Sequence, residues 1–156
     1  MIPYGKQEIT QQDIDAVIRA LQSDFLTLGT QVPAFEKSLT DSTGVKYALA
    51  VNSATSALHI ACLALGLGAG DILWTSPVTF VASANCGLYC GAKVDFVDID
   101  AATYNLCPVK LEEKLITAKQ QGKLPKVLVA VHLCGQPCDM KAIDELAKEY
   151  KFKVIE

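Results

Sequence analysis

The stretch Val127-Leu128-Val129-Ala130-Val131 is an unbroken apolar run that ends just before His132. A run of this kind is typical of a strand that is buried on both faces of a sheet. The other apolar runs cover residues 47–51, 72–74, 94–97 and 152–155, and helical patterns between the runs cover residues 53–65, 79–90, 108–121 and 139–150. This alternation predicts βαβ units, and therefore an α/β fold with three αβα layers and a mostly parallel sheet.

Both ends of the chain differ from this alternation. Two amphipathic helical patterns come first: one begins after Thr10, and the other ends near Gly44. The last apolar run, at residues 152–155, almost reaches the end of the chain. A parallel strand is normally followed by a loop and a covering helix, so we expect the α/β domain to be truncated here.

Composition and charge restrict the classes of function. The 156 residues are 51% hydrophobic and carry a formal net charge of −3, which argues against nucleic acid or an anionic membrane as a partner. The first residues show no signal peptide, and the longest apolar stretch, residues 57–69, is too short to span a membrane. We therefore expect a cytoplasmic protein. Its six cysteines are expected to be free thiols and not metal ligands, because their spacing is not that of a zinc site.

Polar residues follow several of the predicted strands, at the edge where parallel sheets bind their ligands. Residues 52–56 are the most informative of them, and two interpretations stay open. The helix start could bind an anion through free N–H groups, the helix dipole and the hydroxyls of Thr55 and Ser56. Alternatively, Ser53 or Thr55 could simply cap the helix. The stretch is not a P-loop, because no Gly-Lys-Ser/Thr is present. The glycines at residues 66–70 are not a dinucleotide motif, because they follow a helix and precede a strand.

Two further side chains at the same edge have open roles. Phe80 follows the strand at residues 72–74 and could stack on a planar ligand or belong to the core. His132 closes the strand at residues 127–131 and could be a structural or a catalytic residue.

A series of motifs runs in a fixed order from residue 2 to residue 100. The motifs lie at residues 2–4, 28–29, 35–36, 44–48, 52–59, 64–68, 76–85 and 91–100. Together they resemble the DegT/DnrJ/EryC1/StrS family of sugar aminotransferases, which have the aspartate-aminotransferase (type I pyridoxal phosphate) fold. The resemblance implies an N-terminal arm with helices at residues 1–45. It also implies part of the large cofactor-binding domain at residues 46–156, without its C-terminal part and without the small domain.

The resemblance implies pyridoxal 5′-phosphate (PLP) as the cofactor and gives roles to matching residues. Ala54, Thr55 and Ser56 would hold the phosphate, and Phe80 would stack on the pyridine ring. The residues that match substrate-binding stretches of the family are Tyr4, Asp24, Phe25, Leu26, Thr27 and Ala54. His132 and Gln136 lie near the ring in the pattern but receive no role.

The resemblance assigns no catalytic residue within the chain. The family's aspartate that pairs with the pyridine nitrogen would follow Glu156 directly, and the Schiff-base lysine would come further on. No lysine of the chain stands in the family's Ser-Phe…Lys setting. The 156 residues by themselves are therefore expected to be inactive.

The stretch Ser53-Ala54-Thr55-Ser56 is similar to the branch of the family that acts in pseudaminic acid biosynthesis, because most other members have Ser-Gly-Thr there. That branch implies transfer of an amino group from glutamate to the C4 ketone of a UDP-linked 4-keto-6-deoxy-N-acetylhexosamine, by a homodimer, for cell-surface polysaccharides. The alternatives are an aminotransferase or dehydratase of the family that acts on another nucleotide sugar, a noncatalytic nucleotide-binding α/β module, and a truncated product without a function of its own.

Overall fold

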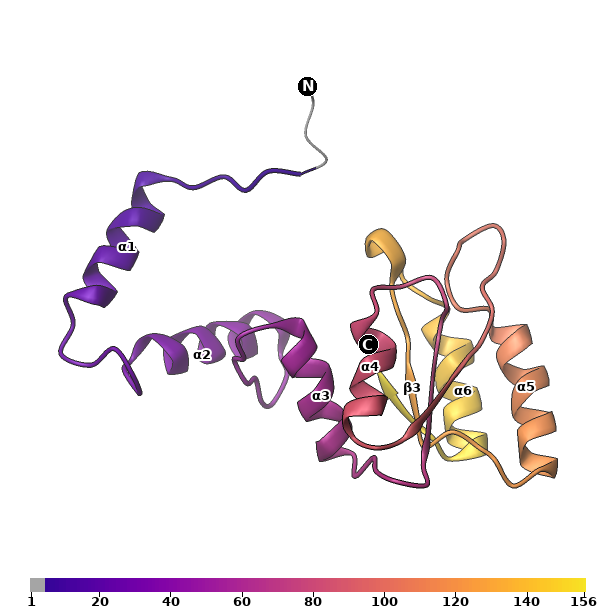
Figure 1. Ribbon diagram of the computed structural model, residues 1–156. Coiled ribbons are helices and arrows are strands. Elements are labelled where there is room, and N and C mark those ends of the chain that lie inside the picture. Colours follow the sequence, from indigo (N-terminus) through magenta and orange to yellow (C-terminus); the bar gives the residue numbers. More distant parts are fainter. Residues whose placement is uncertain (1–4) are drawn as a thin grey trace. The chain divides into compact units, whose positions relative to one another are not determined.

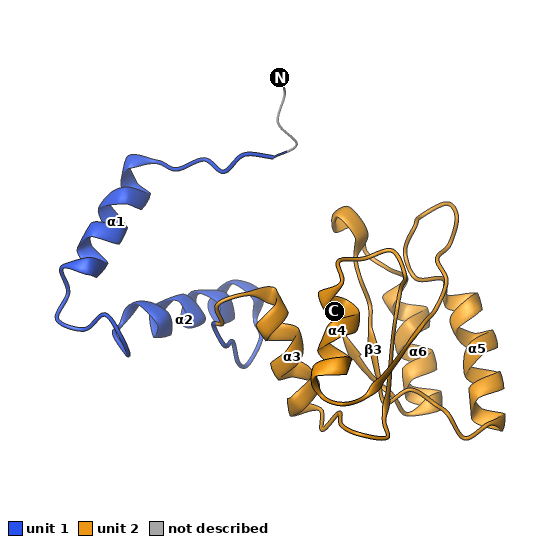
Figure 2. Ribbon diagram, viewed as in Figure 1, with its two compact units in different colours: residues 1–50 blue, residues 51–156 orange. Residues whose placement is uncertain are grey.

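A computed structural model describes residues 5–156, and the chain divides into two compact units (Figure 2). Unit 1 covers residues 1–50 and unit 2 covers residues 51–156. The domain boundary expected from the sequence, at residues 45 and 46, remains a prediction. No helix in the described range, residues 5–156, is both long enough and apolar enough to cross a membrane.

Unit 1 contains two helices, α1 (Gln11–Leu21) and α2 (Gln31–Thr43). A capping box begins α1: the N–H of Thr10 donates to Asp13 Oδ2 at 2.7 Å, and the N–H of Asp13 donates to Thr10 Oγ1 at 3.4 Å. Gly44 ends α2 with a φ of 74°, which a residue with a side chain rarely adopts. Both helices match the two patterns predicted from the sequence. Every residue of both helices is exposed or half-buried, so their apolar stripes are open within this unit.

The strand predicted at residues 47–51 is wrong. These residues form extended chain that belongs to no sheet in the part of the chain that the structure describes. The N–H of Ala50 donates to the Glu36 carboxylate at 2.9 Å, whereas in a strand it would donate to a neighbouring backbone carbonyl. Apolar composition alone cannot supply the neighbour that a strand needs, and Tyr47 and Leu49 are largely exposed.

Unit 2 is built on a parallel sheet with the strand order β2-β1-β3-β4. Figure 1 shows α4 and α6 on opposite sides of β3. The strands are β1 (Ile72–Thr75), β2 (Lys93–Phe96), β3 (Val127–Val129) and β4 (Lys153–Ile155). The helices are α3 (Ala54–Ala64), α4 (Ala82–Tyr89), α5 (Pro108–Gln120) and α6 (Met140–Tyr150), and the 3-10 helix η1 (Leu133–Gly135) follows β3. The predicted α/β class with a mostly parallel sheet is confirmed.

Alternating side chains of the strands form two cores, one on each face of the sheet. Leu73 and Val127 pack with residues of α3 and α4, including the fully buried Cys62. Their neighbours Trp74 and Leu128 point to the other face, where residues of α5 and α6 cover them. This alternation follows from the two-residue repeat of a strand, and it explains why the sequence shows continuous apolar runs.

All six cysteines, which lie within the described part of the chain, are free thiols, and they differ strongly in environment. Burial, with Cys86 close by, raises the pKa of the Cys62 thiol to about 12, so this thiol stays protonated at neutral pH. Cys134 is exposed.

We expect a thiol-alkylating reagent at pH 8 to modify Cys134 first, because the thiolate is the reactive form and Cys134 is open to solvent. Cys62 and Cys86 should react only after the chain is unfolded. Mass spectrometry of peptides from the native and the denatured chain measures this order. Equal labelling rates for Cys62 and Cys134 in the native chain would contradict it.

Candidate functional site

The start of α3 combines a side-chain cap with free backbone donors. Ser53 is the N-cap residue, and its Oγ accepts a hydrogen bond from the N–H of Ser56 at 3.2 Å. The N–H groups of Ala54 and Thr55 have no acceptor among residues 5–156. The capping interpretation is confirmed for Ser53, which satisfies one orphan donor. The anion-binding interpretation stays a prediction, for which two orphan donors remain at the positive end of the helix dipole.

Ser56 is less available than the sequence suggests. Its hydroxyl donates to Asn52 Oδ1 at 2.7 Å and lies 3.1 Å from Ser53 Oγ. Its backbone N–H is already used by Ser53. The donors left for an anion are therefore the backbone N–H groups of Ala54 and Thr55 and the hydroxyl of Thr55.

A pocket of about 590 Å³ lies beside this helix start, and we call it the candidate cofactor pocket. Its lining comes from α3, from the β1–α4 connection and α4, and from the segment after β3: Ala54, Thr55, Leu58, Val78, Thr79, Phe80, Ala82, Ser83, Val131, His132, Leu133 and Cys134. Phe80 is 74% exposed, so it is not a core residue, and its ring is free to contact a ligand. The pocket thus brings together Ala54, Thr55, Phe80 and His132, although Ser56 and Gln136 do not line it.

His132 is held in one tautomer by its two ring contacts. Nδ1 accepts a hydrogen bond from the N–H of Cys138 at 3.1 Å, so this nitrogen keeps its lone pair. Nε2 must then carry the proton, and it lies 3.2 Å from Glu156 Oε2. Next to it, burial raises the pKa of the Cys138 thiol, whose S–H donates to the carbonyl of Val131. These contacts give His132 a clear structural role at the rim of the pocket.

Apart from Ala54 of unit 2, the residues predicted to contact a substrate belong to unit 1. Tyr4 lies outside the described residues. Phe25 and Leu26 line a cavity of about 230 Å³ with apolar residues of α1 and α2, and Asp24 and Thr27 are not part of that lining. Their substrate roles remain a prediction.

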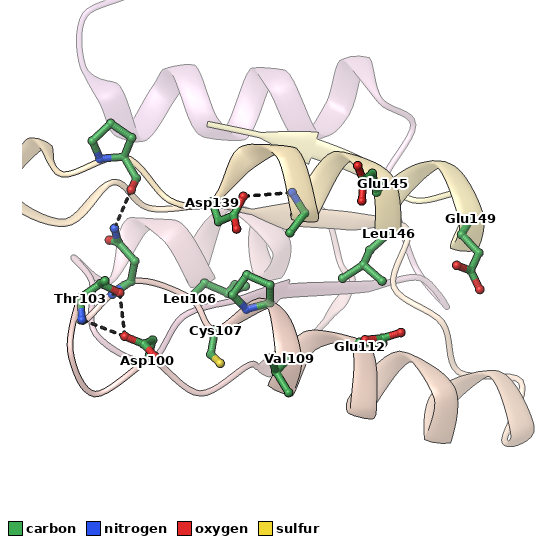
Figure 3. Close-up of a pocket in the computed structure, with 14 residues that line it drawn as sticks. Asp100, Thr103, Leu106, Cys107, Val109, Glu112, Asp139, Glu145, Leu146 and Glu149 are labelled. Carbon is green, nitrogen blue, oxygen red and sulfur yellow. Dashed lines mark hydrogen bonds between the residues drawn. The ribbon is translucent and has the colours of Figure 1, made fainter.

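A second cavity of unit 2 has a different chemistry. It measures about 640 Å³, and Figure 3 shows it lined by Glu112 of α5 and by Glu145 and Glu149 of α6. The sequence does not predict this cavity, because its carboxylates come from separate helices and each helix shows only the charged face that is usual for contact with solvent. Within residues 5–156, no cluster of three or more acidic, histidine or cysteine side chains has the geometry to hold a metal ion.

The pocket suits a planar phosphate ester. The N–H groups of Ala54 and Thr55 and the Thr55 hydroxyl belong to a helix N-terminus in the lining, a place that favours a phosphate. Phe80, an exposed aromatic ring in the same lining, can cover a flat heterocycle. Such an arrangement fits PLP, which the resemblance implies.

Comparison with known proteins agrees with this fit. Residues 7–156 match the DegT/DnrJ/EryC1/StrS aminotransferase family. The UDP-4-amino-4,6-dideoxy-N-acetyl-beta-L-altrosamine transaminase of Campylobacter jejuni subsp. jejuni serotype O:23/36 is 43% identical over 100% of this chain and 40% of its own length. A GDP-perosamine synthase of Caulobacter vibrioides is 41% identical over 91% of this chain and 37% of its own. The solved PLP form of Spr1654 from Streptococcus pneumoniae superposes with a TM-score of 0.86 at 28% identity, over 97% of this chain and 38% of that one.

The fold and the pocket place the chain in the α/β class, with a site that suits a planar phosphate ester such as PLP. More narrowly, the chain belongs to the DegT/DnrJ/EryC1/StrS aminotransferase family, whose cofactor is PLP. It spans about two fifths of the length of the curated relatives that it matches.

Proposed function

We propose that the protein to which these residues belong transfers an amino group from glutamate to the C4 ketone of a UDP-linked 4-keto-6-deoxy-N-acetylhexosamine. The relative at 43% identity, named for an amino sugar of this class, supports the proposal. The six free thiols are compatible with a reducing, cytoplasmic setting. We further propose that the complete protein acts as a homodimer.

The candidate cofactor pocket is the observation that carries the proposal. In it, the N–H groups of Ala54 and Thr55 and the Thr55 hydroxyl would bind the PLP phosphate, and Phe80 would cover one face of the ring. When bound, PLP supplies the electron-accepting ring through which amino groups are exchanged. The lining residues Ala54, Thr55 and Phe80 would bind and orient that group, and Phe80 would limit the access of water to one of its faces.

The chain by itself is proposed to bind the cofactor without completing the reaction. By resemblance, the lysine that moves the proton is outside residues 1–156. Tyr4, Asp24, Phe25, Leu26 and Thr27 are proposed to contact the nucleotide sugar, and Ala54 is proposed to lie beside both ligands.

Binding of pyridoxine 5′-phosphate tests the pocket directly. This alcohol analogue has no aldehyde, so it cannot condense with surface lysines and its binding reports noncovalent recognition alone. We expect calorimetry to show one site, with pyridoxine, which lacks the phosphate, binding at least about 10-fold more weakly because a charge-assisted contact is lost. Equal affinity for the two compounds would contradict a phosphate site in the pocket, and with it the proposed role of α3.

A second candidate substrate is a GDP-linked keto sugar, because the GDP-perosamine synthase relative is nearly as similar to this chain. Steady-state assay of the full-length protein with UDP- and GDP-linked 4-keto sugars distinguishes the two. We expect product from the UDP sugar only. A preference for the GDP sugar would overturn the proposed substrate and leave the reaction class intact.

A further inference from the structure

The segment after β3 forms one wall of the candidate cofactor pocket in a conformation that it does not favour alone. We call residues 132–138 the rim segment. Cys134 and Gly135 are both left-handed, with φ values of 54° and 83°. Such a φ is uncommon for a residue with a side chain, so other parts of the fold must hold Cys134 in place. Because His132, Leu133 and Cys134 line the pocket, the shape of this wall depends on what holds the rim segment.

Asn105 is a side chain from outside the rim segment that bonds to it at three points. Its Nδ2 donates to the carbonyls of Gln136 at 2.9 Å and Pro137 at 3.1 Å. Its Oδ1 accepts from the N–H of Leu133 at 3.0 Å. The side-chain amide of Asn105 thus bonds to Leu133 before the left-handed turn and to Gln136 and Pro137 after it. Asn105 is only 3% exposed, so water cannot replace these partners if they are lost.

The backbone of Asn105 is itself well anchored. Its carbonyl accepts from the N–H of Asp100 at 2.8 Å, and the adjoining residue Leu106 pairs with Ile99 in an antiparallel bridge. Leu106 is also buried in the core under α5 and α6. The side-chain amide therefore projects from a fixed point.

We infer that Asn105 is a positioning residue, which sets the wall of the candidate cofactor pocket by clamping the rim segment across its left-handed turn. The effect of the clamp on cofactor binding rests on the proposed function, whereas the clamp itself requires only contacts within this chain. Asparagine suits the task because it offers two donors and one acceptor on a short stem. Aspartate keeps the shape and the acceptor but turns both donors into an oxygen that faces two carbonyls, and leucine keeps only the approximate volume.

Hydrogen exchange on the 156-residue chain tests the clamp. We expect Asn105→Leu to speed exchange of the Leu133 amide by at least about 10-fold, because its acceptor is lost. Both Asn105→Asp and Asn105→Leu should speed exchange of the Cys138 amide to a similar extent, because the carbonyls of Gln136 and Pro137 lose their donor. Amides of β1, β3 and α3 should keep their protection. Asn85→Asp makes the same chemical change in α4, outside the pocket lining, and should leave the rim unchanged. Unaltered exchange at Leu133 in both Asn105 variants would overturn the inference, and so would a loss of protection spread over the whole sheet.

Ligand binding separates positioning from a general structural role. His132, Leu133 and Cys134 of the rim segment line the pocket, whereas the proposed phosphate donors belong to the start of α3. Both variants should therefore bind pyridoxine 5′-phosphate about 10-fold more weakly while their affinity for inorganic phosphate is kept. An equal loss for both ligands would overturn the positioning role. If the unmodified chain binds neither ligand, the proposed function fails, and the exchange measurement still decides whether Asn105 clamps the rim.

Discussion

The Thr55→Asp variant is expected to bind pyridoxine 5′-phosphate about 100-fold more weakly while its Tm stays equal or rises. Position 55 is the second residue of α3, and its N–H has no acceptor within the described residues 5–156. A carboxylate here would stand where the ligand phosphate is proposed to bind, and two like charges about 5 Å apart repel by roughly 3 kcal/mol at an effective dielectric constant of 20. Binding should therefore be lost even if the backbone is unchanged.

Thr55→Asp is expected to weaken ligand binding but to stabilise the fold. An acidic side chain in the first turn of a helix interacts favourably with the helix dipole, by about 0.3–1 kcal/mol. A variant that loses the ligand through misfolding would also lose stability, so the two measurements together identify the cause. Calorimetric titration gives the affinity, and thermal unfolding without ligand gives the Tm.

Thr55→Asn is the matched neutral control. It has nearly the same size and can still donate a hydrogen bond, so we expect a loss of affinity of no more than about 10-fold. If Thr55→Asp and Thr55→Asn bind equally well, the phosphate does not sit at the start of α3, and the carried-over roles of Ala54 and Thr55 must be abandoned.

Much of unit 2 could be predicted from the sequence because its strands are buried on both faces. The runs around Leu73 and Leu128 are continuously apolar, and each is followed by a helical pattern, so strand and helix positions follow from local periodicity. The failure at residues 47–51 has the opposite cause. That run is apolar too, but strand formation needs a pairing neighbour, and the carboxylate of Glu36 accepts the N–H of Ala50 instead.

The candidate site was only half predictable, for a related reason. A serine or threonine at a helix start indicates capping or anion binding equally well, and only the contacts of Ser53 and Ser56 show that one donor is capped and two are free. The clamp by Asn105 could not be predicted, because its partners lie 28 to 32 residues away in the sequence. Asparagine in a connection between elements ordinarily indicates a turn, and no local pattern distinguishes such a residue from one that bonds across the fold.

The Leu128→Ala variant is expected to lose about 2–5 kcal/mol of unfolding free energy, the usual cost of a cavity in a packed core. Leu128 is fully buried at the centre of β3, and its partners in the ladders are Trp74 of β1 and Val154 of β4. Its side chain fills the core that α5 and α6 cover, so its truncation leaves a cavity among packed neighbours. Denaturant unfolding followed by circular dichroism measures the change.

Leu88→Ala removes the same atoms at a site that is 56% exposed in α4, so it should cost less than about 1 kcal/mol and serves as the control. The comparison bears on the site as well as on the fold. The rim segment begins three residues after β3 ends, so loosening of β3 at Leu128 should also speed hydrogen exchange at Leu133, whereas Leu88→Ala should not. A Leu128→Ala chain that unfolds like the Leu88→Ala chain would mean that β3 is not the packed centre of unit 2. The pocket wall would then depend on the Asn105 clamp and not on the sheet beneath it.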